Sequence, residues 1–346
     1  MSATAQDLQV DAWRPRSRVW QGGRTVADDV PVAELADRLA GDPSVSAWWW
    51  VPRTRDALAE TAELFALDSY AVEDVLSDRE PPKLDGVGRT VVLIGALVAY
   101  DIGSDRLHRD RVAMLATDRM LAVIADDRAA APLIRRLSEG SAGLAADGIP
   151  AGLHALLDAM VHTLGRALLA MEDAADTLTA SLFDDRPMNR AVQLRAFRIR
   201  QATAALHRVT APMSEVTLDL AGAAARPAGD GDDPVADLLN GTLTRRFQDV
   251  CDHARHAANE TNVLREMLNS AYETNLALSD VHLNVIMKKL SGWAAIIAVP
   301  TLITGFLGMN VPYPGFGEGR GFLAGLAVMV LAATSLFILF KRKDWL

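Results

Sequence analysis

Three consecutive residues near the end of the chain, Gly308, Met309 and Asn310, have the chemistry of a site for a hydrated cation. Glycine lets a backbone leave a helix and approach a symmetry axis closely. Asparagine offers a neutral amide oxygen, and a ring of such oxygens holds a hard divalent ion through its bound waters. Mg²⁺ gives up water reluctantly, so contact through water favours passage over capture. Gly-x-Asn also ends ordinary helices, and its position beside an apolar run favours the cation site.

A stripe of residues spaced by three and four precedes this tripeptide, which is the 3.5-residue repeat of a coiled-coil seam. A dry coiled coil would fill the seam with Leu and Ile, whereas this one is polar first and then small. Such a seam suits a water-filled axis shared by several copies. Close packing of small residues in lipid is the alternative, and it leaves Asp280 and Asn284 unexplained. The seam consists of Asn262, Glu266, Asn269, Glu273, Leu276, Asp280, Asn284, Met287, Ser291, Ala294, Ala298, Thr301, Gly305 and Gly308.

Two apolar runs, Trp293–Met309 and Phe322–Phe340, would place these residues in a membrane. Each run is close to the roughly 20 residues that cross a bilayer core. Lysines 288 and 289 precede the first run, and the basic residues 341–343 follow the second. Because basic flanks stay in the cytoplasm, we expect both termini inside and the intervening loop, Val311–Gly321, outside.

The composition narrows the class of protein. The net charge of −9 argues against a nucleic-acid partner. The single cysteine, Cys251, rules out an intrachain disulfide and fits a reducing compartment. The first residues lack the pattern of a cleaved signal. We found no nucleotide motif, and we expect neither ATP coupling nor enzymatic activity.

The order of patterns predicts the domains. Strand-like and helical patterns are mixed over residues 15–130, which predicts an α/β cytosolic domain. The patterns do not determine the order of its strands. Residues 150–220 read as a pair of amphipathic helices. Because Val235–Met309 contains a single proline, we expect one long helix there. Its predicted parts and successors are a stalk helix over 235–290, a pore-lining span over 291–310, an external loop over 311–321, a second span over 322–340 and a basic cytosolic tail over 341–346.

Three separated segments carry a resemblance to a known family: Asn284–Leu290 running into Pro300–Asn310, the ending Phe340–Leu346, and Leu67–Leu76 followed by Arg79 and Pro82–Leu84. They occur in the right order along nearly the whole chain. On these segments the sequence resembles the CorA family of divalent metal-ion (magnesium) transporters.

The resemblance implies a funnel-shaped homopentamer, with an α/β cytosolic domain, a long helical stalk and two transmembrane helices per subunit. Gly308, Met309 and Asn310 would form the selectivity filter. Met287 and Leu290 would form a hydrophobic constriction. The pore-lining residues implied are Glu273, Asp280, Asn284, Met287, Leu290, Ala294, Ala298 and Thr301.

The resemblance also implies a function in the cell (inner) membrane, among lipid. We expect passive uptake of Mg²⁺, with Co²⁺ as a second ion, driven by the membrane potential. Cytosolic Mg²⁺ bound between subunits would hold a closed state, which makes Mg²⁺ both cargo and regulator, and no organic cofactor is expected. Asp249, in the segment Phe247–His253, and Asp101, after Tyr100, are the carboxylates suggested for that regulatory site.

Departures from the family pattern leave alternatives open. Leu307 stands where the family usually has an aromatic residue, and the loop from Val311 to Glu318 lacks the Met-Pro-Glu-Leu pattern of many magnesium channels. Zinc-transporting relatives of the ZntB type also have divergent loops here, so Zn²⁺ transport, perhaps coupled to protons, is an alternative. A membrane-anchored regulatory or scaffold protein is a further one, and it would need no polar seam.

Overall fold

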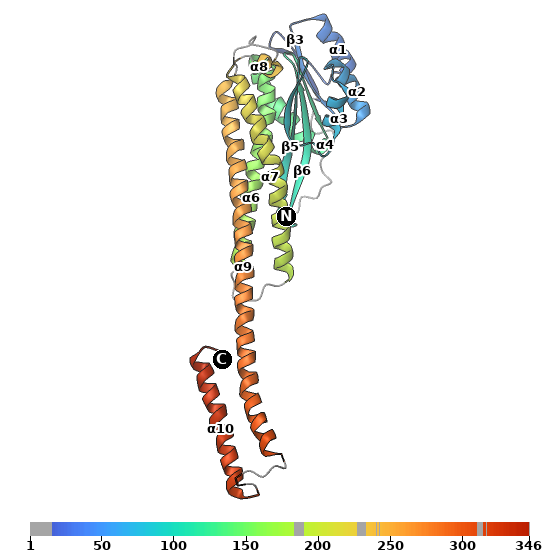
Figure 1. The fold of residues 1–346 in the computed structure, drawn as a ribbon. Helices are drawn as coiled ribbons and strands as arrows, with labels where there is room; N and C mark the ends of the chain where they lie inside the picture. Colours follow the sequence, from blue (N-terminus) through green and yellow to red (C-terminus); the bar gives the residue numbers. More distant parts are fainter. Residues whose placement is uncertain are drawn as a thin grey trace. The chain divides into compact units, whose positions relative to one another are not determined.

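The computed structural model describes residues 16–182, 190–226, 233–239, 241, 243–309, 314–315 and 317–345. Asn310 and most of the predicted external loop lie outside these ranges. The chain forms two compact units, Met1–Asn269 and Ser270–Leu346, which are treated separately below. Figure 1 shows the ribbon with its elements labelled.

The first unit is built on a seven-stranded mixed sheet in the order β2-β1-β3-β7-β6-β5-β4. All neighbours pair antiparallel except β3 and β7, which run parallel with Ala47 beside Met120. The long strands β5 and β6 form a hairpin in register from Val91 and Ala116 to Asp101 and Arg106. The strands are β1 (Ser17–Gln21), β2 (Arg24–Asp28), β3 (Val45–Val51), β4 (Lys83–Val87), β5 (Thr90–Asp101), β6 (Arg106–Ala116) and β7 (Met120–Ala125).

Helices cover both faces of this sheet. α1 (Val32–Gly41), α2 (Arg55–Leu64) and α3 (Ser69–Leu76) bury their apolar residues against one face, around Trp49 and Phe65. The ring N–H of Trp49 donates to Oγ1 of Thr61 at 3.1 Å, so the buried indole is satisfied. Because strand side chains alternate between the two faces, the neighbouring Trp48 supplies the opposite layer. The predicted α/β domain is confirmed, and the strand order is new.

The other face carries α4 (Asp127–Glu139), α5 (Ser141–Asp147) and the long pair α6 (Ile149–Leu182) and α7 (Arg190–Ala224). A Cβ atom at Gly95 of β5 would lie 2.9 Å from the sulfur of Met160 on α6, so the glycine permits this close packing. Oγ1 of Thr163 on α6 accepts a hydrogen bond from the backbone N–H of Val98. The helical pair expected over 150–220 is therefore present and fastened to the sheet.

The predicted single helix from Val235 is wrong at its start. A short helix α8 (Pro234–Leu239) is separate from α9 (Thr244–Leu307). Between them Gly241 and Leu243 have φ angles of 66° and 57°, in the left-handed region that interrupts a helix. Oγ1 of Thr244 donates to the carbonyl of Ala224 at 2.6 Å, which ties the new start to the end of α7.

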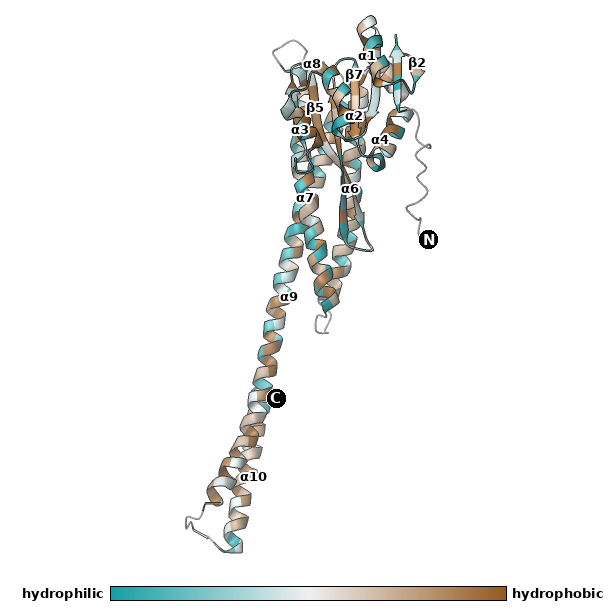
Figure 2. Cartoon of the chain, turned by 90° about the vertical axis from the view of Figure 1, so that its right-hand side faces the viewer, coloured by the Kyte–Doolittle hydropathy of each residue, from teal (hydrophilic) through white to brown (hydrophobic). Residues whose placement is uncertain are grey.

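The second unit contains the end of α9 and the helix α10 (Gly319–Arg342). α9 and α10 are each long and apolar enough to cross a membrane, by length and composition. Figure 2 shows α10 and the last turns of α9 as predominantly hydrophobic. α10 begins three residues before the predicted start of the second span and ends two residues after its predicted end, so the helix is slightly longer than expected.

Candidate functional site

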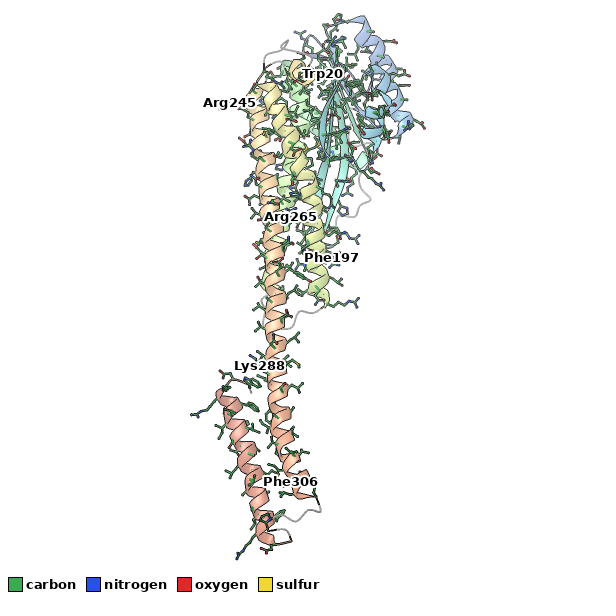
Figure 3. The ribbon with its side chains drawn as sticks, viewed as in Figure 1. Trp20, Phe197, Arg245, Arg265, Lys288 and Phe306 are labelled. Atoms are coloured by element: carbon green, nitrogen blue, oxygen red, sulfur yellow. The ribbon has the colours of Figure 1, made fainter. Side chains whose placement is uncertain are left out.

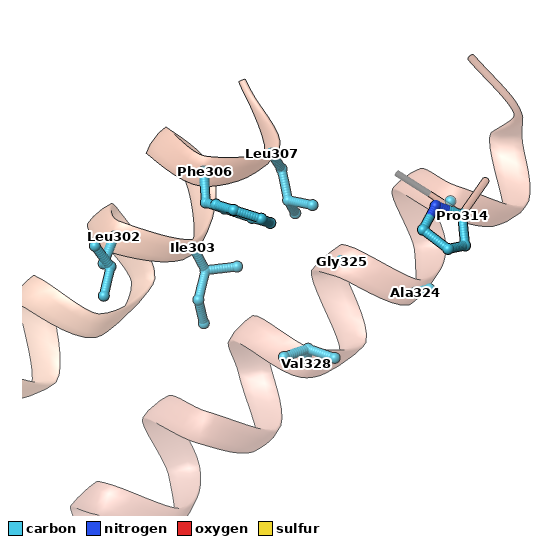
Figure 4. A pocket seen from close by; sticks show the side chains of 9 residues that line it. Leu302, Ile303, Phe306, Leu307, Pro314, Ala324, Gly325 and Val328 are labelled. Carbon is cyan, nitrogen blue, oxygen red and sulfur yellow. The ribbon is translucent and has the colours of Figure 1, made fainter. Parts of the chain in front are cut away.

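One side of α9 packs against α10 in the second unit. Ile303 and Leu307 face Ala324 and Val328 across an apolar groove of about 500 Å³, shown in Figure 4. Gly325 lies at the same contact, where a side chain would collide with Leu307. This side of α9 therefore joins the two predicted spans.

The seam lies on the other side of α9. Ala298, Thr301 and Gly305 line a second, open depression, and none of its described lining residues belongs to α10. It shares Leu302 and Phe306 with the groove to α10. At 3.6 residues per turn, Thr301 lies about 160° around the helix from Ile303. All three seam residues are exposed. The structure thus leaves the stripe of small and hydroxyl residues uncovered by α10.

The seam continues towards the N-terminus of α9. Glu273, Asp280, Asn284 and Ala294 are exposed in the single chain, as are the apolar side chains of Met287 at 58% and Leu290 at 62%. Exposed large apolar residues here are not confined to one side, because Leu276, Leu278, Val281, Leu283, Val285 and Ile286 are exposed as well. A bare helix with this surface needs a partner to remove it from water.

The helix ends where the predicted filter begins. α9 stops at Leu307, and the N–H groups of Gly308 and Met309 donate to the carbonyls of Thr304 and Phe306 at 2.9 and 3.2 Å. A Cβ atom at position 308 would lie 3.1 Å from the Thr304 carbonyl oxygen, so glycine suits this close turn. Gly308 and Met309 are exposed. The backbone therefore leaves the helix at the expected point, and Asn310 itself is outside the described residues.

Aromatic and basic side chains mark the opposite end of the two spans. The rings of Trp293 on α9 and Phe337 on α10 lie 6.4 Å apart, and Nζ of Lys341 lies 5.9 Å from the Phe337 ring. After α10 the chain turns back, and Trp345 stacks on Phe340 at 5.5 Å. Trp and Lys prefer the interface between membrane and water. Lys288, labelled in Figure 3, lies just before the predicted first span on α9 and is also exposed.

Asp101 and Asp249, the two carboxylates suggested for regulation, have different surroundings. Asp101 ends β5, and its carboxylate accepts from Oγ of Ser104 at 2.5 Å and from N–H of Gly103 at 2.9 Å. These two hydrogen bonds lower the pKa of Asp101, that of Ser104 contributing most. Asp249 is exposed on the second turn of α9.

The structure does not bring these two carboxylates together within one chain. The β5–β6 turn that holds Asp101 is fastened to α7, because the buried Asp105 carboxylate lies 3.4 Å from Nε of Arg195. That end of α7 lies beside Leu268 of α9, since Phe197 and Leu268 line one groove. Asp249 is 19 residues earlier on α9, which is roughly 28 Å along the helix.

A second set of charged residues surrounds Lys83. Nζ of Lys83 lies 2.6 Å from Asp74, 2.9 Å from Asp85 and 3.3 Å from Glu80. Burial lowers the pKa of Lys83, but hydrogen bonds to Asp74 and Asp85 outweigh it and leave the pKa raised. Within the described ranges, no three His, Cys, Asp or Glu side chains form a group suited to a metal ion.

Comparison with known proteins places this arrangement in a family. A sequence profile described as "CorA-like Mg2+ transporter protein" matches residues 48–342. The cobalt/magnesium transport protein CorA of Thermotoga maritima is 24% identical over 294 residues, which cover 84% of this chain and 80% of that protein.

Solved structures share the fold over most of the chain. The complete CorA magnesium transporter from Methanocaldococcus jannaschii superposes with a TM-score of 0.72 at 18% identity, covering 95% of this chain and 98% of the other. The cytoplasmic domain of ZntB from Vibrio parahaemolyticus gives a TM-score of 0.54 at 10% identity, covering 76% of this chain and 97% of that domain. At these identities the structural likenesses concern the fold alone.

Proposed function

This chain belongs to the family of CorA-like Mg²⁺ transporter proteins, and from that membership we propose that it is a divalent-cation channel of the cell membrane that admits Mg²⁺, with Co²⁺ as a second ion. The observation that carries the proposal is the uncovered seam on α9. Ala298, Thr301 and Gly305 face away from α10, where a lipid-facing helix would carry large apolar residues. A water-filled path between several copies accounts for this surface.

The channel is a homopentamer in this proposal. The apolar residues exposed between Leu276 and Leu290 support association, because a single chain would leave them in water. A ring of identical subunits buries them while turning the seam towards a shared axis. Met287 and Leu290 then form an apolar constriction that closes by excluding water. Asp280 and Glu273 attract cations to the cytosolic mouth.

Ion choice depends on Asn310 at the outer end of the pore. Its amide oxygen is neutral, so a ring of such groups binds a hydrated ion through water with lower affinity than a ring of carboxylates would. The membrane potential supplies the driving force, about 2.3 kcal/mol per charge per 100 mV and therefore about 4.6 kcal/mol for a divalent ion. Both termini lie in the cytoplasm, which agrees with the basic residues that flank the spans.

Regulation by cytosolic Mg²⁺ is the second part of the proposal. A cation between neighbouring subunits would neutralise carboxylates and hold a closed state, and its loss would let them repel. Asp249 is exposed on α9 and is free to meet another copy. Asp101 is the weaker candidate for the second ligand. Its carboxylate accepts a hydrogen bond within the β5–β6 turn, and that turn lies near Leu268 of α9, far from Asp249.

Flux into liposomes tests the function. Purified protein is reconstituted and challenged with Mg²⁺, Co²⁺ and Zn²⁺, with and without a proton gradient. We expect Mg²⁺ entry that follows the membrane potential and is independent of the proton gradient, and we expect Asn310→Ala to change the ratio of Mg²⁺ to Co²⁺ entry. Proton-dependent Zn²⁺ flux alone would make the chain a zinc transporter. Flux of none of the three ions would leave the anchored-scaffold alternative.

A further inference from the structure

Three arginines gather at the edge of the sheet where the parallel strands β3 and β7 end. Arg53 follows the end of β3, and Arg109 and Arg111 lie on β6. In the sheet β7 lies between β3 and β6, and Arg111 precedes Val112, which pairs with Ala125 at the end of β7. Arg53 and Arg111 therefore flank the end of β7, and we call the three arginines the arginine cluster. The carboxyl ends of parallel strands are a frequent binding place in α/β proteins.

Arg111 is the unusual member of the arginine cluster. It is 6% exposed, and its Nε and Nη2 atoms have no hydrogen-bond partner among the described residues. Burial lowers the pKa of Arg111 and repulsion from Arg109 and Arg53 lowers it further, which the more distant Glu80 and Asp78 only partly offset. A buried charge without a partner is costly, and side chains kept at such a cost are often functional.

The acidic residues around the cluster have other partners. Glu80 lies 3.3 Å from Nζ of Lys83, within the set of charges that surrounds that lysine. Asp126 is exposed and lies 3.5 Å from Nη2 of Arg53. In the described part of the chain, no carboxylate forms an ion pair with Arg111. The cluster therefore contains one guanidinium group for which its own chain supplies no direct counter-charge.

Asp78 connects the arginine cluster to solvent. Its carboxylate is 79% exposed and accepts a hydrogen bond from Nη2 of Arg53 at 2.6 Å. Its backbone carbonyl accepts another from Nη2 of Arg109 at 3.0 Å. Arg109 is exposed as well. An ion pair with so exposed a carboxylate contributes little to stability, so an anion with more charge and more oxygen atoms can replace it.

We propose that the arginine cluster binds a phosphate group, carried by inorganic phosphate or by a nucleotide, which displaces the Asp78 carboxylate from Arg53 and supplies the counter-charge that Arg111 lacks. Guanidinium groups bind phosphate through paired hydrogen bonds, and three of them suit an anion with several oxygen atoms. The unpaired atoms of Arg111 are closed to solvent while Asp78 is in place, so binding includes a movement of the Asp78 side chain and its loop. The site lies in the first unit, and the inference does not depend on the proposed function.

Isothermal titration of the full-length protein in detergent micelles, with inorganic phosphate at constant ionic strength, tests the site. We expect saturable binding to the unaltered chain and a loss of affinity of about tenfold or more in Arg111→Met. Asp78→Asn keeps the shape of residue 78 but removes the competing charge, so it should tighten binding several-fold. Arg106→Met, at an exposed position of the same strand, removes the same charge as Arg111→Met and should leave the affinity unchanged.

A parallel titration with ATP, without divalent ions, distinguishes the two sources of the phosphate group. Tighter binding of ATP than of inorganic phosphate, lost in Arg111→Met, would identify a nucleotide as the ligand. Equal or weaker binding of ATP would identify inorganic phosphate. Absence of saturable binding for both probes, or unchanged affinity in Arg111→Met, would overturn the proposal.

Thermal unfolding separates binding from folding. Without phosphate, Arg111→Met should melt at or above the temperature of the unaltered chain, because it removes a buried charge without a partner. Phosphate should raise the melting temperature of the unaltered chain more than that of Arg111→Met, because a ligand stabilises only the form that binds it. Equal rises would reflect the general stabilising effect of phosphate salts and would contradict the site. A variant that melts well below the unaltered chain without phosphate would show instead that Arg111 is structural.

Discussion

Gly325 of α10 lies so close to Leu307 of α9 that a Cβ atom at position 325 would come within 2.5 Å of Cδ1 of Leu307. This contact lies at the groove between the two predicted spans (Figure 4). Two helices in lipid gain little from the hydrophobic effect, so close contact through small residues is what holds them together. The relationship explains why a glycine occupies the middle of an apolar helix.

Replacing Gly325 by valine should loosen the helix pair. The added isopropyl group must displace Leu307, and overpacking of this kind costs about 1–3 kcal/mol. Thermal unfolding in detergent micelles measures the loss. Gly305→Ala is the matched control, because in the described part of the chain nothing lies within 4 Å of a Cβ atom at 305. Equal melting temperatures for the two variants would show that the contact is dispensable.

A bulky residue at Gly305 should block transport without unfolding the chain. Gly305→Leu fills the depression on the seam side of α9, which α10 does not cover. We expect Mg²⁺ flux into liposomes to fall about tenfold or more, since pore diameter limits passage. Leu331→Trp changes an exposed residue of α10 and should leave flux unchanged. Full flux through Gly305→Leu would remove the seam from the ion path.

Asp249 and Asp101 should respond differently to neutralisation. Asp249→Asn should raise the cytosolic Mg²⁺ concentration needed for closure several-fold, because it removes an exposed carboxylate from the proposed regulatory site between subunits. Asp101→Asn should change that concentration much less than Asp249→Asn does, because the Asp101 carboxylate is engaged by Ser104 and Gly103. Channel currents recorded at stepped internal Mg²⁺ distinguish the two. A shift for Asp101→Asn alone would reverse the assignment.

Lys83 should be important for the stability of the cytosolic domain. Lys83→Met leaves Asp74, Asp85 and Glu80 without their shared cation, at a cost of roughly 1–3 kcal/mol near neutral pH. Because the folded pKa of Lys83 is above its unfolded value of about 10.4, its stabilisation is complete below that pH and declines as the pH rises past it. Denaturant unfolding should show a constant deficit around neutrality that closes in strong alkali. A deficit that widens in alkali would contradict this sign.

Arg111 and Arg53 should behave oppositely when replaced by methionine. Arg111 on β6 is 6% exposed, and its Nε and Nη2 atoms have no hydrogen-bond partner among the described residues. Burial lowers the pKa of Arg111, and the nearby Arg109 and Arg53 lower it further. Arg111→Met should therefore be neutral or stabilising by up to about 2 kcal/mol. Arg53→Met should destabilise, because Arg53 donates to the Leu76 carbonyl and to Asp78. Chemical denaturation of both variants checks the contrast.

The sequence patterns predicted what depends on local periodicity. The two long apolar helices, the α/β domain and the helical pair follow from runs and repeats of apolar residues, and the structure contains each of them. The seam follows from steps of three and four; its described residues in the second unit are exposed, and its role in a pore stays a prediction. The order of the strands could not be predicted. Alternation of side chains along β5 indicates which residues are buried, but it does not indicate which strand pairs with β5.

Other features depend on residues far apart in the sequence or on a signal that was overlooked. The break before α9 had such a signal, since Asn-Gly at 240–241 is a common turn pair and Gly241 has a positive φ angle. The suggestion of Asp101 as a partner of Asp249 came from the resemblance to the CorA family. The ion pair between Asp105 and Arg195 fixes where the β5–β6 turn lies along α7. These two residues are 90 positions apart, so no local sequence pattern reveals their contact.

The exposed seam on α9 has a consequence for assemblies that mix altered and unaltered chains. If every subunit contributes one copy of each stripe residue to a common path, an altered chain made together with a normal one enters most assemblies. A single subunit with a bulky residue in place of Gly305 would then narrow the path for the whole assembly. Where altered and unaltered chains are made in one cell, changes at the seam should therefore lower transport by the mixed assemblies, whereas changes that unfold a subunit before it joins others should not.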